Sequence, residues 1–177
     1  NDKMAGKIAT QYVIRKGHTR IGGVFKLDDG QGARRYAGFV DAMNQAGLKI
    51  TGKDLIWFDT EDLQTEENVH DLAMKIRRRL STRTALVMYN DETAYKIVSE
   101  FKNEGINVPE DISIVGIDDN PVSTGGLVQI SSVVYPTKDI AVKIARNMIE
   151  LIRDGQFEGT YEFNVKLVER DSVMDIS

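Results

Sequence analysis

The sequence of 177 residues contains no cysteine. Disulfide bonds and cysteine-ligated metal sites are therefore excluded, whereas a reducing compartment is permitted. Positive charge is also in short supply, because 23 Lys and Arg stand against 27 Asp and Glu, which gives a net charge of −4. This balance argues against a chain that itself grips a nucleic-acid backbone, since such affinity comes from clustered Lys and Arg.

Long apolar runs are absent as well. No stretch approaches the ~20 apolar residues that span a bilayer, and no signal peptide is recognisable. A chain of this length suits one domain or a little more, and it can bury roughly 70% of the surface that it exposes when unfolded. We therefore expect a globular domain with a substantial core and no membrane partner.

Apolar periodicity predicts alternating helices and strands. Helical i, i+3, i+4, i+7 spacing occurs at 4–13, 33–43, 69–80, 94–101 and 140–152. Short β-type runs lie between these segments at 21–25, 55–58, 85–89 and 112–117, and a last run at 161–167 alternates as a half-exposed edge strand should. The pattern predicts an α/β fold, a doubly wound parallel sheet flanked by helices. Since such domains normally begin with a strand, we expect the first strand of the domain to be absent from this chain.

Short polar residues follow two of the predicted strands. Asp118 and Asp119 come directly after the run at 112–117, and Asn90 and Asp91 follow the run at 85–89. In open parallel sheets, ligands bind outside the carboxyl ends of the strands. Carboxylate and amide oxygens accept hydrogen bonds from hydroxyl groups. The sequence therefore predicts a site for a polar small molecule with the hydroxyl groups of a sugar.

Other motifs favour structural roles. His18 lies in a predicted turn, and His70 has no second ligand at i+4 that would indicate a metal site. The basic run at 77–79 ends a helix, where cations complement the helix dipole. Asp118 and Asp119 are adjacent on an extended backbone, so their side chains diverge, unlike the facing carboxylates of a glycosidase. We therefore expect no catalytic residue, no metal site and no cofactor, and we interpret the chain as a binding module rather than an enzyme.

Six strings in order resemble the effector-binding region of LacI/GalR-type transcriptional repressors. They are KGHTRIG at 16–22, ARRYAGF at 33–39, YNDETA at 89–94, VPEDISIVGIDD at 108–119, SSV at 131–133 and LVERDS at 167–172. Within that family, the string FKLDDGQG at 25–32 is most similar to arabinose-responsive repressors. The resemblance covers nearly the whole chain.

The resemblance implies a periplasmic-binding-protein-like (type I) fold with two lobes. Residues 1–135 would form the C-terminal lobe. Residues 136–166 would be a helix and a strand of a mostly missing N-terminal lobe, and 167–177 would be the return strand and tail. The expected partners are a small-molecule sugar effector, a second copy of the chain in a homodimer, and DNA only through a domain absent from this chain. A cytoplasmic location follows from that role.

The same resemblance assigns roles to three residues. Arg35 would bind two adjacent sugar hydroxyls with its fixed donors. Asp118 would accept hydrogen bonds from sugar hydroxyls, and Asn90 would pair with a further hydroxyl. Asp91 is expected to cap the helix that starts at Glu92. Without the resemblance, the sequence favours a surface arginine on a helix for Arg35, and Asp118 has the alternative role of a helix cap or turn residue.

Three further ligand positions follow from the resemblance: Gln31, Thr60 and Tyr135. Family members often stack the sugar on an aromatic residue near position 60. Here Trp57 and Phe58 precede that position within a strand, which leaves Tyr135 as a possible substitute.

Two alternatives remain open from the sequence. One is a transport-associated sugar-binding protein of the same fold without a DNA-binding domain, and the other is a doubly wound enzyme acting on sugars. The string at 108–119 favours the repressor, and no nucleophile–base pair supports the enzyme. We also expect the apolar stripe of the helix at 137–153 to be exposed in this chain and to drive association.

Overall fold

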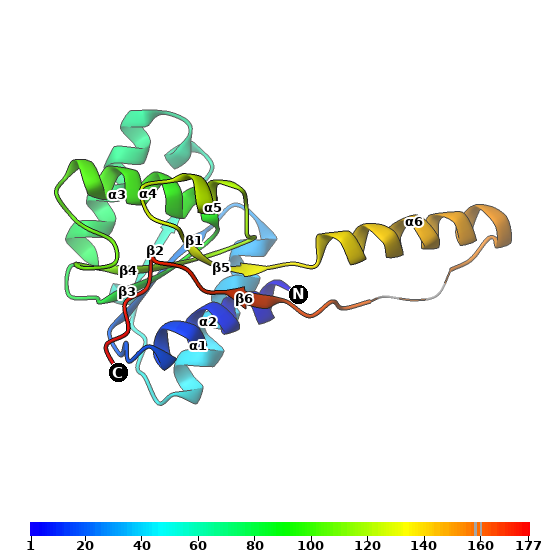
Figure 1. Ribbon diagram of the computed structural model, residues 1–177, viewed down its shortest axis with the longest axis horizontal. Coiled ribbons are helices and arrows are strands. Elements are labelled where there is room, and N and C mark those ends of the chain that lie inside the picture. Colours follow the sequence, from blue (N-terminus) through cyan, green and yellow to red (C-terminus); the bar gives the residue numbers. More distant parts are fainter. Residues whose placement is uncertain (158, 160) are drawn as a thin grey trace.

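The computed structural model describes residues 1–157, 159 and 161–177. Within these residues the centre is a six-stranded sheet of order β2-β1-β3-β4-β5-β6 (Figure 1). Strands β1 to β5 pair in parallel, and β6 is antiparallel to β5. The strands are β1 (Ile21–Lys26), β2 (Leu55–Phe58), β3 (Ala85–Met88), β4 (Ser113–Ile117), β5 (Ser131–Val134) and β6 (Lys166–Val168). The predicted parallel α/β fold is confirmed.

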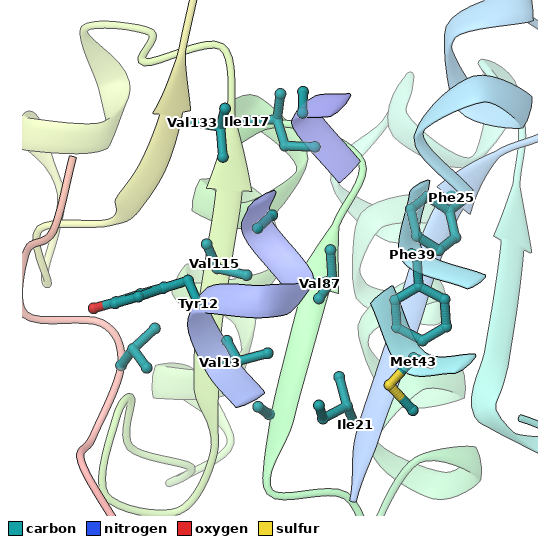
Figure 2. Close-up of a cluster of buried hydrophobic side chains, with 14 of the residues drawn as sticks. Tyr12, Val13, Ile21, Phe25, Phe39, Met43, Val87, Val115, Ile117 and Val133 are labelled. Atoms are coloured by element: carbon teal, nitrogen blue, oxygen red, sulfur yellow. The ribbon is translucent and has the colours of Figure 1, made fainter. Parts of the chain in front are cut away.

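Helices cover both faces of the sheet. They are α1 (Asp2–Arg15), α2 (Gly30–Gln45), α3 (Glu66–Arg79), α4 (Asp91–Asn103), α5 (Val122–Gly125) and α6 (Thr137–Asp154), with 3-10 turns η1 (Gly52–Asp54) and η2 (Glu61–Leu63). Alternate residues of a strand face opposite sides, so in β3 Val87 joins the core under α1 and α2 while Leu86 joins the core under α3 and α4. Figure 2 shows the first core, in which Val115 lies near Tyr12 of α1 and Phe39 extends from α2.

Short polar residues begin four of the helices. The side chain of Asp29 accepts from the Gly32 amide at 2.7 Å, and that of Asn90 accepts from the Thr93 amide at 2.9 Å. Asn1 and Thr65 cap α1 and α3 in the same way. Such caps satisfy amides that have no partner inside the helix. The prediction that Asp91 caps a helix starting at Glu92 is wrong, because Asn90 is the cap and Asp91 is already the first helical residue.

Two glycines bring α1 and α2 into close contact. A Cβ atom at Gly38 would overlap the main-chain oxygen of Lys3, and one at Gly6 would overlap the main-chain oxygen of Arg35. Only hydrogen at these positions permits that approach. The contact places the start of α1 directly beside Arg35.

Helix α6 extends away from the sheet (Figure 1). None of its residues is buried, and Ile144, Ile149 and Ile152 are 60%, 61% and 79% exposed. No helix in the described part of the chain is long and apolar enough to cross a membrane.

The edge strand predicted at 161–167 is wrong over most of its length. Residues 158 and 160 lie outside the described residues, 161–165 have no strand structure, and β6 begins at Lys166. A strand requires a partner ladder, and on the side of β5 away from β4 the described pairs involve only Lys166, Leu167 and Val168. Alternation of apolar residues cannot supply that partner.

Candidate functional site

Arg35 is the centre of a polar cluster at the carboxyl ends of the parallel strands. It projects from the second turn of α2, and its side chain is 1% exposed. One guanidinium nitrogen donates to the main-chain oxygen of Tyr89 at 2.7 Å, and the other donates to Asp118 Oδ1 at 2.6 Å. Arg35 is therefore a buried residue held between the ends of β3 and β4, and the reading as a surface arginine is wrong.

Asp118 and Asp119 follow β4 in an unusual backbone conformation. Their φ angles are 105° and 50°, a region that residues other than glycine rarely adopt. Asp118 turns its carboxylate to Arg35, whereas Asp119 accepts from Arg170 Nη2 at 2.5 Å. The two carboxylates diverge as predicted, but the extended backbone expected for them is wrong, because both residues have positive φ and each carboxylate turns to its own arginine.

Two tyrosines flank the Arg35 guanidinium. Its central carbon lies 4.9 Å from the ring centroid of Tyr89 and 5.9 Å from that of Tyr135. The hydroxyl of Tyr89 donates to Asp29, and that of Tyr135 donates to Asp2 at 2.8 Å. The structure thus brings Tyr135, a position that the resemblance implied, to the cluster and adds Tyr89 to it.

Asp2 was not among the residues predicted from the sequence. Its carboxylate accepts from Tyr135 and from Arg34 Nε at 3.0 Å, and it lies 3.5 Å from Arg35 Nε and 3.5 Å from Gln31 Nε2. In the sequence, Asp2 is only an acidic residue in the first turn of a helix, which is common. No local signal identifies it, because its partners come from α2 and from the end of β5.

The remaining predicted residues lie further out. Thr60 is exposed and donates to Asp28 Oδ2 at 2.6 Å, so it is tied to the loop before α2 rather than to Arg35. Asn90 uses its side-chain oxygen to cap α4. Its amide nitrogen is then the group that can donate to a ligand. Gln31 is exposed, with its side-chain oxygen 3.4 Å from the Tyr89 hydroxyl.

Burial and charge act against each other on the ionisable groups. Burial opposes the charge on Arg35, but Asp118 and Asp2 outweigh it and raise the pKa of the guanidinium. Burial raises the pKa of Asp118 above its usual range, although Arg35 opposes that shift. For Asp2, burial is outweighed by hydrogen bonds from Tyr135 and Arg34, which lower its pKa. Arg35 therefore stays charged, and Asp118 is the carboxylate that gives up its charge more readily.

The cluster is rich in acceptors. Both tyrosine hydroxyls donate to carboxylates, and the guanidinium is already paired with Asp118. The spare capacity is therefore mainly on the oxygens of Asp2, Asp29 and Asp118, which suits a ligand with many hydroxyl donors. In the described residues, no group of three or more His, Asp or Glu side chains is placed to hold a metal ion.

The sequence is similar to known regulators. Residues 10–173 match the family described as periplasmic binding protein-like domain. The arabinose metabolism transcriptional repressor of Geobacillus stearothermophilus is 32% identical over 178 residues, which cover 99% of this chain and 49% of that protein. The transcriptional repressor PurR of Photobacterium profundum is 29% identical, with 100% of this chain and 52% of that protein covered. The chain spans about half the length of these curated relatives.

Solved structures show the same fold. A sugar-binding transcriptional regulator of the LacI family from Escherichia coli, complexed with phosphate, matches with a TM-score of 0.86 and 26% identity over 99% of this chain and 62% of that one. The complex of the regulator CelR with cellobiose matches with a TM-score of 0.85 and 24% identity over 97% of this chain and 52% of that one. The predicted resemblance and fold class are confirmed. The chain belongs to the periplasmic binding protein-like family and has the fold of the LacI-family regulators.

Proposed function

We propose that the chain is the sugar-sensing part of a bacterial transcriptional repressor that acts in the cytoplasm. The effector would be L-arabinose or a related sugar. The observation that carries this proposal is the buried Arg35, held by Asp118 at the carboxyl ends of the strands. The similarity to proteins named as arabinose metabolism repressors supports the choice of sugar.

Charge favours a neutral sugar over a phosphorylated one. Asp2 and Asp118 lie beside the buried guanidinium of Arg35, and Asp29 accepts from the hydroxyl of Tyr89, whose ring flanks that guanidinium. A phosphate would bring two further negative charges beside these carboxylates, whereas hydroxyl groups would donate to them. In this proposal Asp118 and Arg35 bind adjacent hydroxyls, and Asn90, Gln31 and Tyr135 complete the contacts. Thr60 lies at the edge and would meet only a larger ligand.

The exposed face of α6 supports the proposed two-lobed arrangement. Residues 1–135 would form the C-terminal lobe, 136–166 would pack with an N-terminal lobe, and 167–177 would return to the first. Exposed apolar patches of the α6 kind mark surfaces that another element covers. The sugar would bind between the lobes and shift the population toward one lobe arrangement.

That shift would reach DNA through a separate domain and a homodimer. Tyr95, Lys96 and Val122 on α4 and α5 are the proposed dimer contacts. The Tyr95 side chain is exposed, while Ile97 and Phe101 of the same helix are buried in the core, so only one face of α4 is free for a partner. A homodimer would contain two sugar sites that act on one shared conformational change.

Isothermal titration calorimetry of the full-length protein tests the proposal. L-arabinose, other neutral pentoses and hexoses, a pentose phosphate and a purine base are the ligands. We expect saturable binding of one neutral sugar and at least about ten-fold weaker binding by Asp118→Asn, since the variant loses hydrogen bonds to a charged group. The matched control is Arg77→Ala, which removes a half-exposed arginine of α3 far from the site. Binding of the purine or the phosphate alone, or equal affinity in Asp118→Asn, would overturn the proposed ligand class.

A further inference from the structure

A buried carboxyl group lies directly behind the ligand site. Asp91 is fully buried at the first position of α4. It accepts hydrogen bonds from the Ser132 hydroxyl at 2.7 Å and from the Asn120 amide at 2.8 Å. None of the proposed sugar contacts uses this group.

The partners of Asp91 belong to the turn that carries Asp118. Three consecutive amides of this turn are held from outside it. The Asp118 amide donates to the main-chain oxygen of Val133 at 2.8 Å, the Asp119 amide donates to the Ser132 hydroxyl at 3.0 Å, and the Asn120 amide donates to Asp91. Two successive residues with positive φ cost about 1–3 kcal/mol each, so the turn persists only because its surroundings hold it.

Asp91 and Ser132 form one unit in this support. The Ser132 hydroxyl donates to Asp91 and accepts from the Asp119 amide. It therefore connects the Asp91 carboxylate to the turn. Gly116 of β4 packs against the same carboxyl group, because a Cβ at that position would overlap Asp91 Oδ1. The carboxyl group is thus confined on the strand side and bonded on the turn side.

The same turn also leads to the outer face of the molecule. Beyond it, Arg170 binds Asp119 and donates to Ser123 Oγ at 3.2 Å and to the main-chain oxygen of Ile130 at 2.7 Å, which holds α5 in place. Asp91 itself is the first residue of α4. The hydrogen bonds of Asp91 therefore connect the turn that carries Asp118 to the start of α4.

We propose that Asp91, together with Ser132, is a positioning residue that holds the Asp118–Asn120 turn in the conformation that presents Asp118 to the ligand, and that it links the ligand site to the start of α4. The inference rests on the proposed function of the Arg35 site. It assigns to Asp91 no contact with the ligand.

The protonation state of Asp91 gives a second way to test this role. Burial, and then the nearby Asp118 and Asp119, raise the pKa of Asp91 to about 7, although bonds from Ser132 and Asn120 oppose the shift. The charged groups that face it are those two carboxylates, each paired with its own arginine, while β5 contributes only the uncharged Ser132. Substitution by Asn mimics the protonated carboxyl group at every pH.

Calorimetric titration of the full-length protein with L-arabinose tests the role. We expect Asp91→Ala to bind about ten-fold more weakly than wild type, since its turn has lost a hydrogen bond to a charged group. Asp91→Asn should bind at least about three-fold more weakly near pH 8 but equally near pH 5.5, where wild-type Asp91 is also neutral. The control is Thr93→Ala, which alters a buried residue of the same helical turn whose hydroxyl has no hydrogen-bond partner. Wild-type affinity in Asp91→Ala, or an Asn effect that is the same at both pH values, would overturn the inference.

Amide hydrogen exchange followed by NMR separates this inference from the proposed function. It needs no sugar. The amides of Asp119 and Asn120 should be protected in wild type and in Thr93→Ala and should exchange rapidly in Asp91→Ala. Unchanged protection in Asp91→Ala would refute the positioning role even if sugar binds. Absence of sugar binding by wild type would refute the proposed function while the exchange result still decides the role of Asp91 in the turn.

Discussion

Replacement of Arg35 by methionine offers a quantitative test of the buried cluster. Methionine retains much of the aliphatic stem but removes the guanidinium group. The variant loses the 2.7 Å bond to the Tyr89 carbonyl and the 2.6 Å bond to Asp118. It also loses the stacking of the guanidinium between the rings of Tyr89 and Tyr135. What remains is a partly buried carboxylate without its partner.

The cost follows from that orphaned charge. Removing one partner of a buried ion pair destabilises a protein by about 3–5 kcal/mol. The Asp118 side chain is 34% exposed, so water replaces part of the lost interaction. We therefore expect Arg35→Met to lower the free energy of unfolding by about 3 kcal/mol near pH 7.5.

The loss should shrink at lower pH. Burial raises the pKa of Asp118 even with Arg35 present, and without Arg35 the folded-state pKa rises further. A group whose pKa is higher in the folded state binds more protons there, so its folded state gains stability as the pH falls through that pKa. The destabilisation by Arg35→Met should therefore be smaller near pH 5 than near pH 7.5, by roughly 1 kcal/mol or more.

Urea unfolding of the chain, followed by circular dichroism at the two pH values, measures both effects. The double variant Arg35→Met/Asp118→Asn removes the orphaned charge and should be more stable than Arg35→Met near pH 7.5. A coupling energy of about 0.5–3 kcal/mol is expected from the double-mutant cycle. A loss below about 1 kcal/mol, or a loss independent of pH, would refute the picture of a buried pair.

Three further predictions concern other parts of the chain. Asp91→Asn should raise the free energy of unfolding near pH 8 by at most about 4 kcal/mol, because the wild-type pKa is raised to about 7; urea titration should show the gain shrink as the pH falls below about 7 and vanish only below about pH 4, where Asp91 is mostly protonated in both the folded and the unfolded state. Gly38→Ala should cost about 3 kcal/mol in the same assay, because its Cβ overlaps main chain of α1, whereas Gly52→Ala, with open space around it, should change little. The chain should self-associate in sedimentation velocity through α6, and Ile149→Asn/Ile152→Asn should sediment as a monomer; an unchanged profile would contradict that role of α6.

The secondary structure was largely predictable because it depends on local spacing. The apolar stripe at 69–80 became α3, and the run at 112–117 became β4. The edge strand predicted at 161–167 was largely wrong, because a strand also needs a neighbour that is not encoded in its own residues. The wrong prediction that Asp91, rather than Asn90, caps α4 has a similar origin. Both side chains can cap a helix, but the Asp91 carboxylate instead accepts a hydrogen bond from the buried Ser132 hydroxyl.

The residues of the candidate site likewise fall into those that were predicted and those that were not. The resemblance identified Arg35, Asp118 and Tyr135, and the structure places them together. It did not identify Asp2 or Asp91, since an acidic residue in the first turn of a helix looks the same in sequence whatever it contacts.

The sequence by itself determined the alternating parallel fold, the polar residues that end β3 and β4, and the apolar stripe of α6. These follow from side-chain periodicity and from the order of elements along the chain, whereas the exposure of that stripe was implied by the resemblance to a two-lobed family. Only the tertiary structure decided which charges meet. Asp2 reaches Arg35 because two glycines let α1 and α2 approach, and Asp91 supports the Asp118 turn because Ser132 of β5 lies between them. Contacts between elements far apart in sequence depend on how the elements pack, and no local pattern carries that information.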